Sequence, residues 1–444
     1  MSEFRQELRQ EKARLFIYSI DTIYQLQALD ALPLHQLARQ SGFFRRSPRK
    51  LSLEAFLHTA LLSVAQPTWS LRNWAACLSA LQQQLFSKQA LHKRCQSRAV
   101  DFLQALIAGH LGRVCSRAAR PALFANFARV FLQDSTSLWL HRTLAADFPA
   151  SGNQSHQPSA GLKIQAVFEL LTQRWFAFQL GPFTRTDQQA AADCLDWIKP
   201  GDLLLRDLGY AVLPLWQELL NRGAYFVSRL RSDIAIFDQK GQALDLIALL
   251  QAGSFSSTQV KVGHSEQIPL RLVALKLPAK LAAQRRRRAR ANAKRDRRLR
   301  LTRRYLKLQD WTLLVTNVEQ KTWSAQQVLE AYQCRWQIEV LFKAWKTHFQ
   351  IHHLPTTANP EQLLLTLCCK LLAIALLQQF LLPVWDQPCH RPFSPLRLAA
   401  YFAFLLPLIL LLPELIDSGQ LAYFCRYDKR PSRPNFFEKL ASLS

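Results

Sequence analysis

The chain has 444 residues, with 57 Lys and Arg against 31 Asp and Glu and a formal net charge of +26. This length is sufficient for several domains and a large core. The charge favours a polyanionic partner, most simply nucleic acid, and a membrane surface is the competing explanation. Nine cysteines without a CxxC pair argue against a disulfide framework and against a structural zinc site.

Residues 1–16 and two apolar stretches in the last quarter of the chain bear on targeting and membrane insertion. Residues 1–16 are charged throughout and lack an apolar core, so they do not predict a secretory signal. The apolar stretches 371–384 and 399–412 are shorter than the roughly 18–20 uninterrupted residues of a spanning helix. We therefore expect buried core helices in a cytoplasmic protein, with a membrane hairpin as the alternative.

Residues 1–125 predict a helical DNA-binding domain, with apolar periodicity near 12–28, 51–65, 71–81 and 97–112. Within this domain, two helical patterns near 70–80 and 87–94 resemble a helix-turn-helix, with Ser87 capping the second helix. The side chains placed near DNA would be Lys88, Gln89, His92 and Lys93. An ordinary helical pair with a solvated polar face explains the same pattern.

Residues 126–231 change to an alternation of strands and helices. Strands are predicted at 129–134, 163–171, 175–181, 202–207 and 224–230, with helices at 188–198 and 211–222. The order β-β-β-α-β-α-β is that of an RNase H-like sheet. Asp134 and Asp207 end two of these strand-like runs, and the carboxyl ends of strands are where α/β sheets build their sites.

Residues 232–318 interrupt this core as a predicted β-rich insertion with strand-like pieces at 259–263, 268–277 and 311–318. Between 284 and 304 the chain has twelve basic residues and one acid, without Gly or Pro, which predicts a basic helix. A solvated or disordered arm is the alternative. The one-sided charge favours contact between this segment and the phosphate backbone of DNA. Arg287 and Arg288 are the arginines predicted to make this contact.

Residues 319–354 are expected to return to the core through a helix at 324–350, and residues 355–444 predict a Leu-rich helical C-terminal region. At about 100° per residue, five polar side chains share an arc of about 80° on this helix. They are Tyr332, Arg335, Glu339, Lys343 and Lys346. Simple i,i+4 pairing on a surface helix is the alternative. The position of the helix after the fifth strand favours a catalytic role.

Asp134, Asp207 and Glu339, called here the acidic triad, are the ligand set expected for two divalent metals. In phosphodiester chemistry two ions about 3.5–4 Å apart activate the nucleophile and stabilise the leaving oxygen. Hard cations such as Mg²⁺ prefer carboxylate oxygens, so the triad is predicted to be both catalytic and metal-binding. Arginine and lysine are suited to clamping phosphates, and tyrosine to hydrogen bonding or stacking. The DNA contacts on this helix are therefore predicted to be Tyr332, Arg335, Lys343 and Lys346.

These motifs resemble those of bacterial insertion-sequence DDE transposases, in the group with a Y-(2)-R-(3)-E-(6)-K signature. The signature is matched by Tyr332, Arg335, Glu339 and Lys346. Residues 133–136 resemble the family's first-aspartate motif, and residues 206–210 resemble its second. The resemblance implies an α/β fold. Its parts are an RNase H-like mixed sheet with an inserted β-rich subdomain, an N-terminal helical DNA-binding domain and a C-terminal helical domain.

The resemblance also implies a function: cut-and-paste movement of an insertion sequence by two-metal hydrolysis and strand transfer through a DNA hairpin. It implies two Mg²⁺ ions, with Mn²⁺ as a substitute. The expected partners are terminal inverted repeats and target double-stranded DNA, bound by a homodimer on the bacterial nucleoid. Trp311 stands where the family stacks a flipped base, although a core tryptophan at a strand start fits equally well. A catalytically inactive DNA-binding derivative is the alternative function, and a membrane-associated protein is a third.

Overall fold

The computed structural model describes residues 33–44, 51–65, 69–111, 121–150, 159–251, 257–295, 301–385, 394–411 and 423–425. The side chains of 377–385, Pro395 and 406–411 are not described. The predicted helical stretch at 12–28 and the basic residues 45–50 lie outside these ranges.

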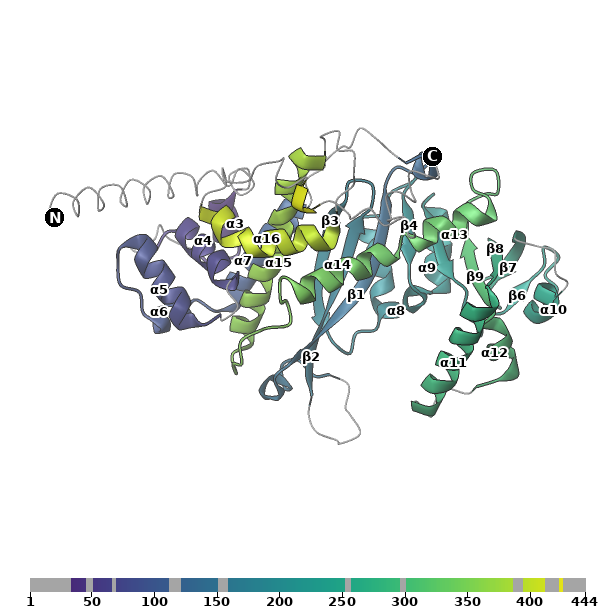
Figure 1. Cartoon of the computed structure of the whole chain (residues 1–444), viewed down its shortest axis with the longest axis horizontal. Helices are drawn as coiled ribbons and strands as arrows, with labels where there is room; N and C mark the ends of the chain where they lie inside the picture. The colour runs from purple at the N-terminus through teal and green to yellow at the C-terminus, as the bar shows by residue number, and fades with distance from the viewer. Residues whose placement is uncertain are drawn as a thin grey trace.

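One mixed sheet runs through the molecule, and its first five strands have the RNase H-like arrangement (Figure 1). The strands are β1 (Val130–Leu140), β2 (Ala160–Glu169), β3 (Arg174–Pro182), β4 (Leu203–Arg206) and β5 (Tyr225–Arg229). Their order across the sheet is β3-β2-β1-β4-β5. Strands β1–β3 are antiparallel neighbours, whereas β4 pairs in parallel with both β1 and β5. The predicted RNase H-like α/β fold is confirmed.

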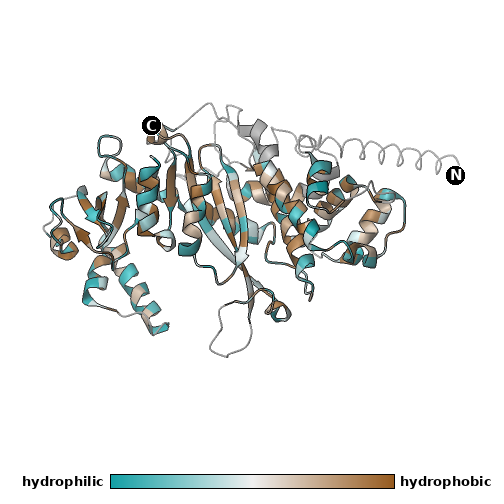
Figure 2. Ribbon diagram, turned by 180° about the vertical axis from the view of Figure 1, so that it is seen from behind, coloured by the Kyte–Doolittle hydropathy of each residue, from teal (hydrophilic) through white to brown (hydrophobic). Residues whose placement is uncertain are grey.

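The predicted insertion extends this sheet. Its strands are β6 (Ile236–Phe237), β7 (Ser257–Val262), β8 (Ile268–Lys276) and β9 (Trp311–Thr316). Strand β9 pairs antiparallel with β5, and the order continues β9-β8-β7-β6. The helices of the insertion are α10 (Leu246–Gln251), the arginine-rich α11 (Ala279–Arg295) and α12 (Arg303–Leu308). Helix α11 projects beyond the sheet, and its hydrophilic turns stand out in Figure 2.

Side-chain alternation along the strands separates two hydrophobic cores. On β1, Val130, Leu132 and Leu138 belong to the larger core, whereas Phe131 points to the smaller one. The larger core is covered by α13 (Ala325–Gln333) and α14 (Trp336–Thr347), whose Val328 and Ile338 are fully buried. The smaller core is covered by α9 (Leu213–Asn221) and the segment around α8 (Asp187–Ala190). The sheet therefore separates α14 from α8.

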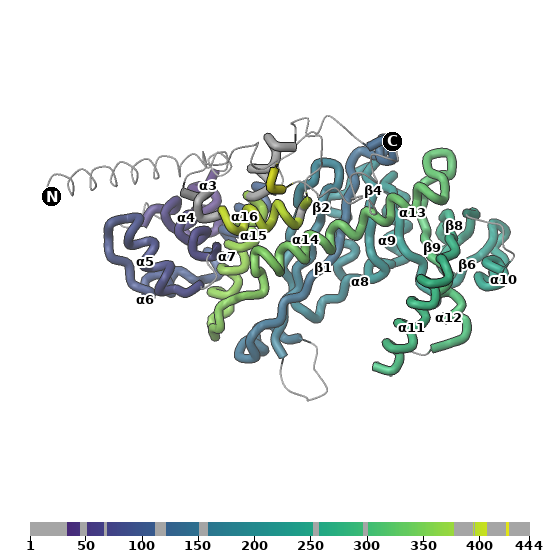
Figure 3. The backbone as a smooth tube through the Cα atoms, viewed as in Figure 1, coloured from purple at the N-terminus to yellow at the C-terminus, as the bar shows by residue number. Residues whose placement is uncertain are grey.

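The N-terminal and C-terminal helical regions pack together beside the sheet (Figures 1 and 3). The helices are α3 (Leu34–Gln40), α4 (Leu53–Val64), α5 (Leu71–Gln82), α6 (Lys88–His92), α7 (Ser97–Leu111), α15 (Pro360–Trp385) and α16 (Pro395–Leu411). Helix α15 packs on α7, and His110 of α7 hydrogen-bonds the Ala375 carbonyl at 3.1 Å. Within the described part of the chain, no helix combines the length and apolar character that a membrane span requires.

Three predicted elements differ from the structure. Strand β1 continues to Leu140, so Asp134 lies inside it and does not end it, because residues 131–140 stay paired with β2. The helix predicted at 188–198 is one α-helical turn followed by a 3-10 helix at Ala191–Asp196. The helix predicted at 324–350 is two helices, separated at Cys334 and Arg335 by i→i+3 hydrogen bonds.

Candidate active site

The register of β1 and β4 brings Asp134 and Asp207 side by side. The two parallel strands pair from Val130↔Leu203 to Gln133↔Arg206, and the next residue on each strand is the aspartate. Neighbouring strands lie about 4.7–4.9 Å apart. Strand β4 ends at Arg206, and the chain after Asp207 turns into a short 3-10 helix, Leu208–Tyr210. Only Asp207 is thus at a strand end, but the register makes the two aspartates neighbours.

Helix α14 brings Glu339 to the same place through Arg335. The Arg335 guanidinium donates from Nη2 to Glu339 Oε1 at 2.7 Å and from Nη1 to Asp134 Oδ2 at 3.4 Å. Arg335 and Asp134 are largely buried, with side-chain exposures of 13% and 18%, whereas Glu339 is 43% exposed. Arg335 therefore lies between a strand carboxylate and a helix carboxylate.

The surroundings of Asp134 shift the pKa of its carboxyl group. Burial, together with the nearby Asp207 and Glu339 carboxylates, raises the pKa of Asp134 to about 6. The Ser135 amide, which donates to Asp134 Oδ1 at 2.8 Å, and the Arg335 charge act in the opposite direction. The net result is a crowded group of carboxylates for which a bound cation would be favourable.

Two buried polar atoms at this site lack a partner among the described residues: the Tyr332 hydroxyl oxygen and Arg335 Nε. Burial raises the pKa of Tyr332 to about 12, so its hydroxyl remains a proton donor at neutral pH. Buried donors without partners are costly, and they mark places where a water or a ligand oxygen binds. A phosphate oxygen would satisfy both.

The residues fit a divalent metal in donor type but are not arranged as a ready cage. Among the described residues, no three His, Cys, Asp or Glu side chains meet closely enough to hold one ion. These carboxylates do not meet because Arg335 lies between Asp134 and Glu339 and contacts both. Carboxylate oxygens are nonetheless the ligands that Mg²⁺ prefers. Metal binding at the triad would require Arg335 to move away from these carboxylates.

The two lysines of α14 and its first residue face solvent. Lys343 and Lys346 are exposed, one and two turns beyond Glu339, and no ion pair involves them in the described structure. Trp336, beside Arg335, is 58% exposed. Both lysines are therefore free to contact a ligand that approaches the triad along α14.

Helix α11 has an attached face and a free face. Arg285 donates to the Trp311 carbonyl at 3.2 Å, and Arg286 pairs with Asp310, so these two arginines fasten the helix to the start of β9. Arg287 and Arg288 are exposed, and their contact with DNA stays a prediction. Other exposed cations of the helix are Arg290, Lys294 and Arg295.

Trp311 is the first residue of β9 and is only half-buried. Its ring packs beside the smaller core, and the Lys276 ammonium lies 6.0 Å from its centroid. These contacts fit a tryptophan that supports the sheet, and stacking of a flipped base on it stays a prediction.

Two helices, α5 and α6, lie where the helix-turn-helix or an ordinary helical pair was predicted, and Ser87 caps α6 through its hydroxyl, which accepts from the Ala90 amide at 3.2 Å. Helix α6 has only five residues. Its side chains Lys88, Gln89 and His92, and Lys93 after it, are exposed, and their contact with DNA stays a prediction.

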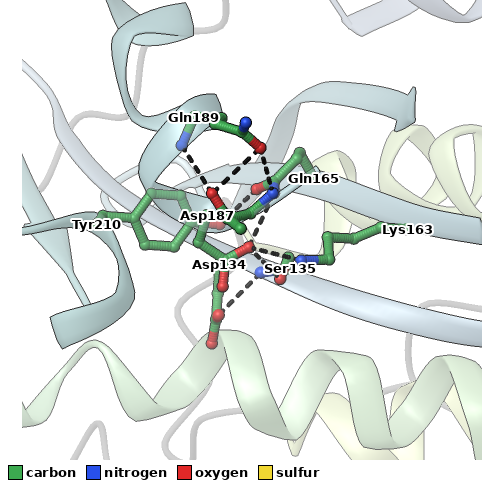
Figure 4. Close-up of polar contacts among 8 residues, drawn as sticks. Asp134, Ser135, Lys163, Gln165, Asp187, Gln189 and Tyr210 are labelled. Atoms are coloured by element: carbon green, nitrogen blue, oxygen red, sulfur yellow. Dashed lines mark hydrogen bonds and ion pairs between the residues drawn. The ribbon is translucent and has the colours of Figure 1, made fainter. Parts of the chain in front are cut away.

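Sequence reasoning missed a polar cluster on the other side of β1 (Figure 4). It consists of Ser135, Lys163, Gln165, Asp187 and Tyr210, and we call it the Asp187 cluster. No spacing rule joins these residues, because they come from β1, β2, α8 and the turn after β4.

The chain is similar to known transposases. The transposase DDE domain model matches residues 125–374, which contain the whole sheet and the acidic triad. This chain belongs to the transposase DDE domain family.

Several relatives are similar over most of their length. A transposase of insertion sequence element IS231F from Bacillus thuringiensis subsp. israelensis is 30% identical over 367 residues, 77% of this chain and 76% of that protein. The IS231B transposase from Bacillus thuringiensis subsp. berliner is 29% identical, covering 72% and 71%. The IS1151 transposase from Clostridium perfringens is 26% identical, covering 73% of each. A cryo-EM structure of a piggyBac transposase synaptic complex with hairpin DNA aligns with a TM-score of 0.42 and 11% identity, covering 92% of this chain and 84% of that chain.

Proposed function

We propose that this chain is a DNA transposase that moves an insertion sequence by metal-dependent strand cleavage and transfer, with Asp134, Asp207 and Glu339 as its catalytic residues. The observation that carries the proposal is that the β1–β4 register and the contacts of Arg335 bring together carboxylates from β1, from the end of β4 and from α14, in a member of a transposase family. The excess of basic residues supports double-stranded DNA as the partner.

The roles of the chain's own residues follow from their positions. The acidic triad would hold two Mg²⁺ ions, or Mn²⁺ in their place, which when bound supply an activated nucleophile and a stabilised leaving oxygen. Asp134 must be ionised to serve as a ligand. While no metal is bound, Arg335 pairs with Asp134 and Glu339. Once metal displaces it, its guanidinium would be free to contact a phosphate.

The DNA lies along α14 in this proposal. The exposed Lys343 and Lys346 clamp phosphates beside the scissile bond, and the buried Tyr332 hydroxyl donates to a phosphate oxygen. Arg287 and Arg288 of α11 hold a second stretch of the duplex. Terminal inverted repeats and target DNA are the proposed substrates, and the nucleoid is the proposed site of action. A hairpin intermediate and a base stacked on Trp311 complete the proposed reaction sequence.

The first prediction tests the catalytic assignment through Glu339. Replacement of Glu339 by Gln removes one ligand charge and keeps the side chain's shape, so we expect loss of DNA nicking by at least 100-fold, in line with the cost of losing a group that acts on the transition state. Binding to the same DNA should be unchanged. The measurement is Mg²⁺-dependent nicking of a plasmid that carries the inverted repeats flanking the gene, beside a gel-shift assay.

A matched control is available one helix earlier. Glu330 of α13 hydrogen-bonds Gln326 at 2.8 Å and has no contact with the triad, so Glu330→Gln should nick normally. Retained nicking by Glu339→Gln would refute the assignment. A wild-type protein that binds these ends and never nicks them would instead identify an inactive DNA-binding derivative.

A further inference from the structure

The Asp187 cluster joins the chain segments that follow the two aspartates of the triad. Asp187 Oδ1 accepts hydrogen bonds from Ser135 Oγ at 2.8 Å, from Gln165 Nε2 at 3.0 Å and from Lys163 Nζ at 3.3 Å. Gln165 Oε1 in turn accepts a hydrogen bond from the Tyr210 hydroxyl. Ser135 follows Asp134 directly, and Tyr210 lies three residues after Asp207. Figure 4 shows these side chains converging on Asp187.

The cluster is largely enclosed, and packing and hydrogen bonds hold its side chains in place. Tyr210 and Gln165 are 1% and 6% exposed, and Asp187 is the first residue of α8, held there by a capping box between Thr186 and Gln189. Gly209 packs against the Asp187 carboxylate: a Cβ at Gly209 would lie only 3.2 Å from Oδ2. The turn that carries Tyr210 and Gly209 thus rests on Asp187.

The paired backbone of β1 and β4 stops one residue short of the two aspartates. Pairing between β1 and β4 ends at Gln133↔Arg206, one residue before Asp134 and Asp207. Beyond that point β1 continues with β2, whereas the chain after Asp207 turns away. The Asp187 cluster restores the connection, since Gln165 stands directly opposite Ser135 in the β1–β2 ladder and also binds Tyr210.

We propose that the Asp187 cluster positions Asp134 and Asp207 relative to each other, and so sets the separation of the metal ligands on β1 and β4. This inference rests on the proposed function and adds positioning residues to it. Partners of metal ligands orient them, and their loss typically lowers metal affinity about 10–100-fold. Here the cluster would orient the two ligands through the backbone, because it holds Ser135 next to Asp134 and Tyr210 three residues after Asp207.

Asp187 is better suited to this role than to that of a further metal ligand. Its Oδ1 already accepts three hydrogen bonds, one of them from the Lys163 ammonium. Its contacts run to Ser135, and residues 134 and 135 point to opposite faces of β1. Asp134, in contrast, faces Arg335 on α14.

The test compares Tyr210→Phe and Ser135→Ala with the wild-type full-length chain. Each substitution removes one hydroxyl and no bulk that the fold needs. We expect the dissociation constant for Mn²⁺, measured by calorimetry without DNA, and the Mg²⁺ concentration for half-maximal nicking to rise about 10-fold in each variant. DNA affinity, measured by gel shift, should not change. Hydrogen exchange at residues 133–136 and 206–210 should quicken in Tyr210→Phe.

A matched control lies in the same segment. Asp193 pairs with Arg185 at 2.6 Å and has a side-chain exposure of 26%, close to the 28% of Asp187, so Asp193→Asn should leave metal dependence unaltered. Equal metal constants in wild type, Tyr210→Phe and Ser135→Ala would overturn the positioning role. The variant Asp134→Asn tests the proposed metal site separately from the positioning role of the cluster. Unchanged Mn²⁺ binding in that variant would refute the metal site itself, whatever the cluster variants do.

Discussion

Arg335 contacts two of the three carboxylates of the triad, and this contact defines the metal-free site. Its guanidinium compensates charges that burial would otherwise make costly. The same contact opposes metal binding, because a divalent ion and the guanidinium would compete for Asp134 and Glu339. In the proposed function, one residue would stabilise the metal-free state and would become available to the DNA once metal binds.

The second prediction concerns this dual role. Arg335→Gln should destabilise the metal-free protein by about 2 kcal/mol, because Asp134 loses its partly buried partner, with the exposed Glu339 contributing little. Mn²⁺ should bind more tightly, since the competing cation is gone, while nicking should fall. Thermal unfolding in EDTA and calorimetry with Mn²⁺ measure the two effects. Weaker Mn²⁺ binding in the variant would contradict competition between Arg335 and the metal.

The third prediction uses the raised pKa of Asp134. Because its folded pKa is about 6, above the ordinary value, the contribution of Asp134 to stability is fully present below about pH 4 and is lost as the pH rises through 6. In EDTA, Asp134→Asn should therefore be more stable than wild type at pH 7.5, on the order of 2 kcal/mol. The difference should vanish near pH 4.

Urea unfolding across this pH range measures the effect. The exposed Asp147, replaced by Asn, serves as the control and should give a curve parallel to wild type. A stability gap between Asp134→Asn and wild type that does not change with pH would contradict the raised pKa.

At the scale of elements, α11 shows how a charge-rich sequence forms an ordered helix. Ala282 and Ala289, two turns apart, are buried, and Arg285 and Arg286 between them bind β9 and Asp310. This inward face fixes the helix on the sheet. The outward face then presents Arg287 and Arg288 in a defined direction, which favours contact with a duplex over a solvated arm.

The fourth prediction follows for the salt dependence of DNA binding. Each neutralised phosphate contributes about −0.9 to the slope of log K against log salt, so Arg287→Ala with Arg288→Ala should reduce the steepness by about 2. Gel shifts at several salt concentrations give the slopes. The control pair Lys199→Ala with Lys240→Ala removes the same charge from exposed positions, Lys199 being at the far end of β4 from Asp207. Equal slopes in the two double variants would argue against α11 as a DNA contact.

At the scale of the whole molecule, one sheet connects the parts that we propose to act on DNA. Strand β9 joins β5, so the insertion with α11 is continuous with the strands that carry Asp134 and Asp207. The helical regions pack at the other side, through α7 and α15. DNA bound along α14 and at α11 would therefore be held by one framework.

The fifth prediction concerns assembly. We propose that two copies act together, because excision requires both ends of an element to be cut. Light scattering after gel filtration, with duplexes that carry the two terminal repeats, should give complexes with two protein chains and two ends. A complex in which a single chain holds both ends and still joins them to a target would contradict the homodimer.

The sequence by itself predicted the elements whose residue patterns are local. Alternating and continuous apolar runs located the strands of the sheet other than β6, and helical periodicity located α4, α5 and α7, together with α13 and α14 as one helix. The triad was predicted because each carboxylate has a recognisable neighbourhood along the chain. The membership of the transposase family confirms the resemblance that those neighbourhoods carried.

The tertiary structure decided the features that depend on partners far away in the chain. Strand β1 passes Asp134 because β2 continues to pair with it, and no local pattern contains that register. Arg335 bridges Asp134 and Glu339 only once α14 lies across β1. Asp187 meets Ser135 and Gln165 from a helix about 50 and 20 residues away in sequence. Local propensity determines which segments form strands and helices. The positions of the charged side chains around the triad depend instead on packing between segments that are far apart in the sequence.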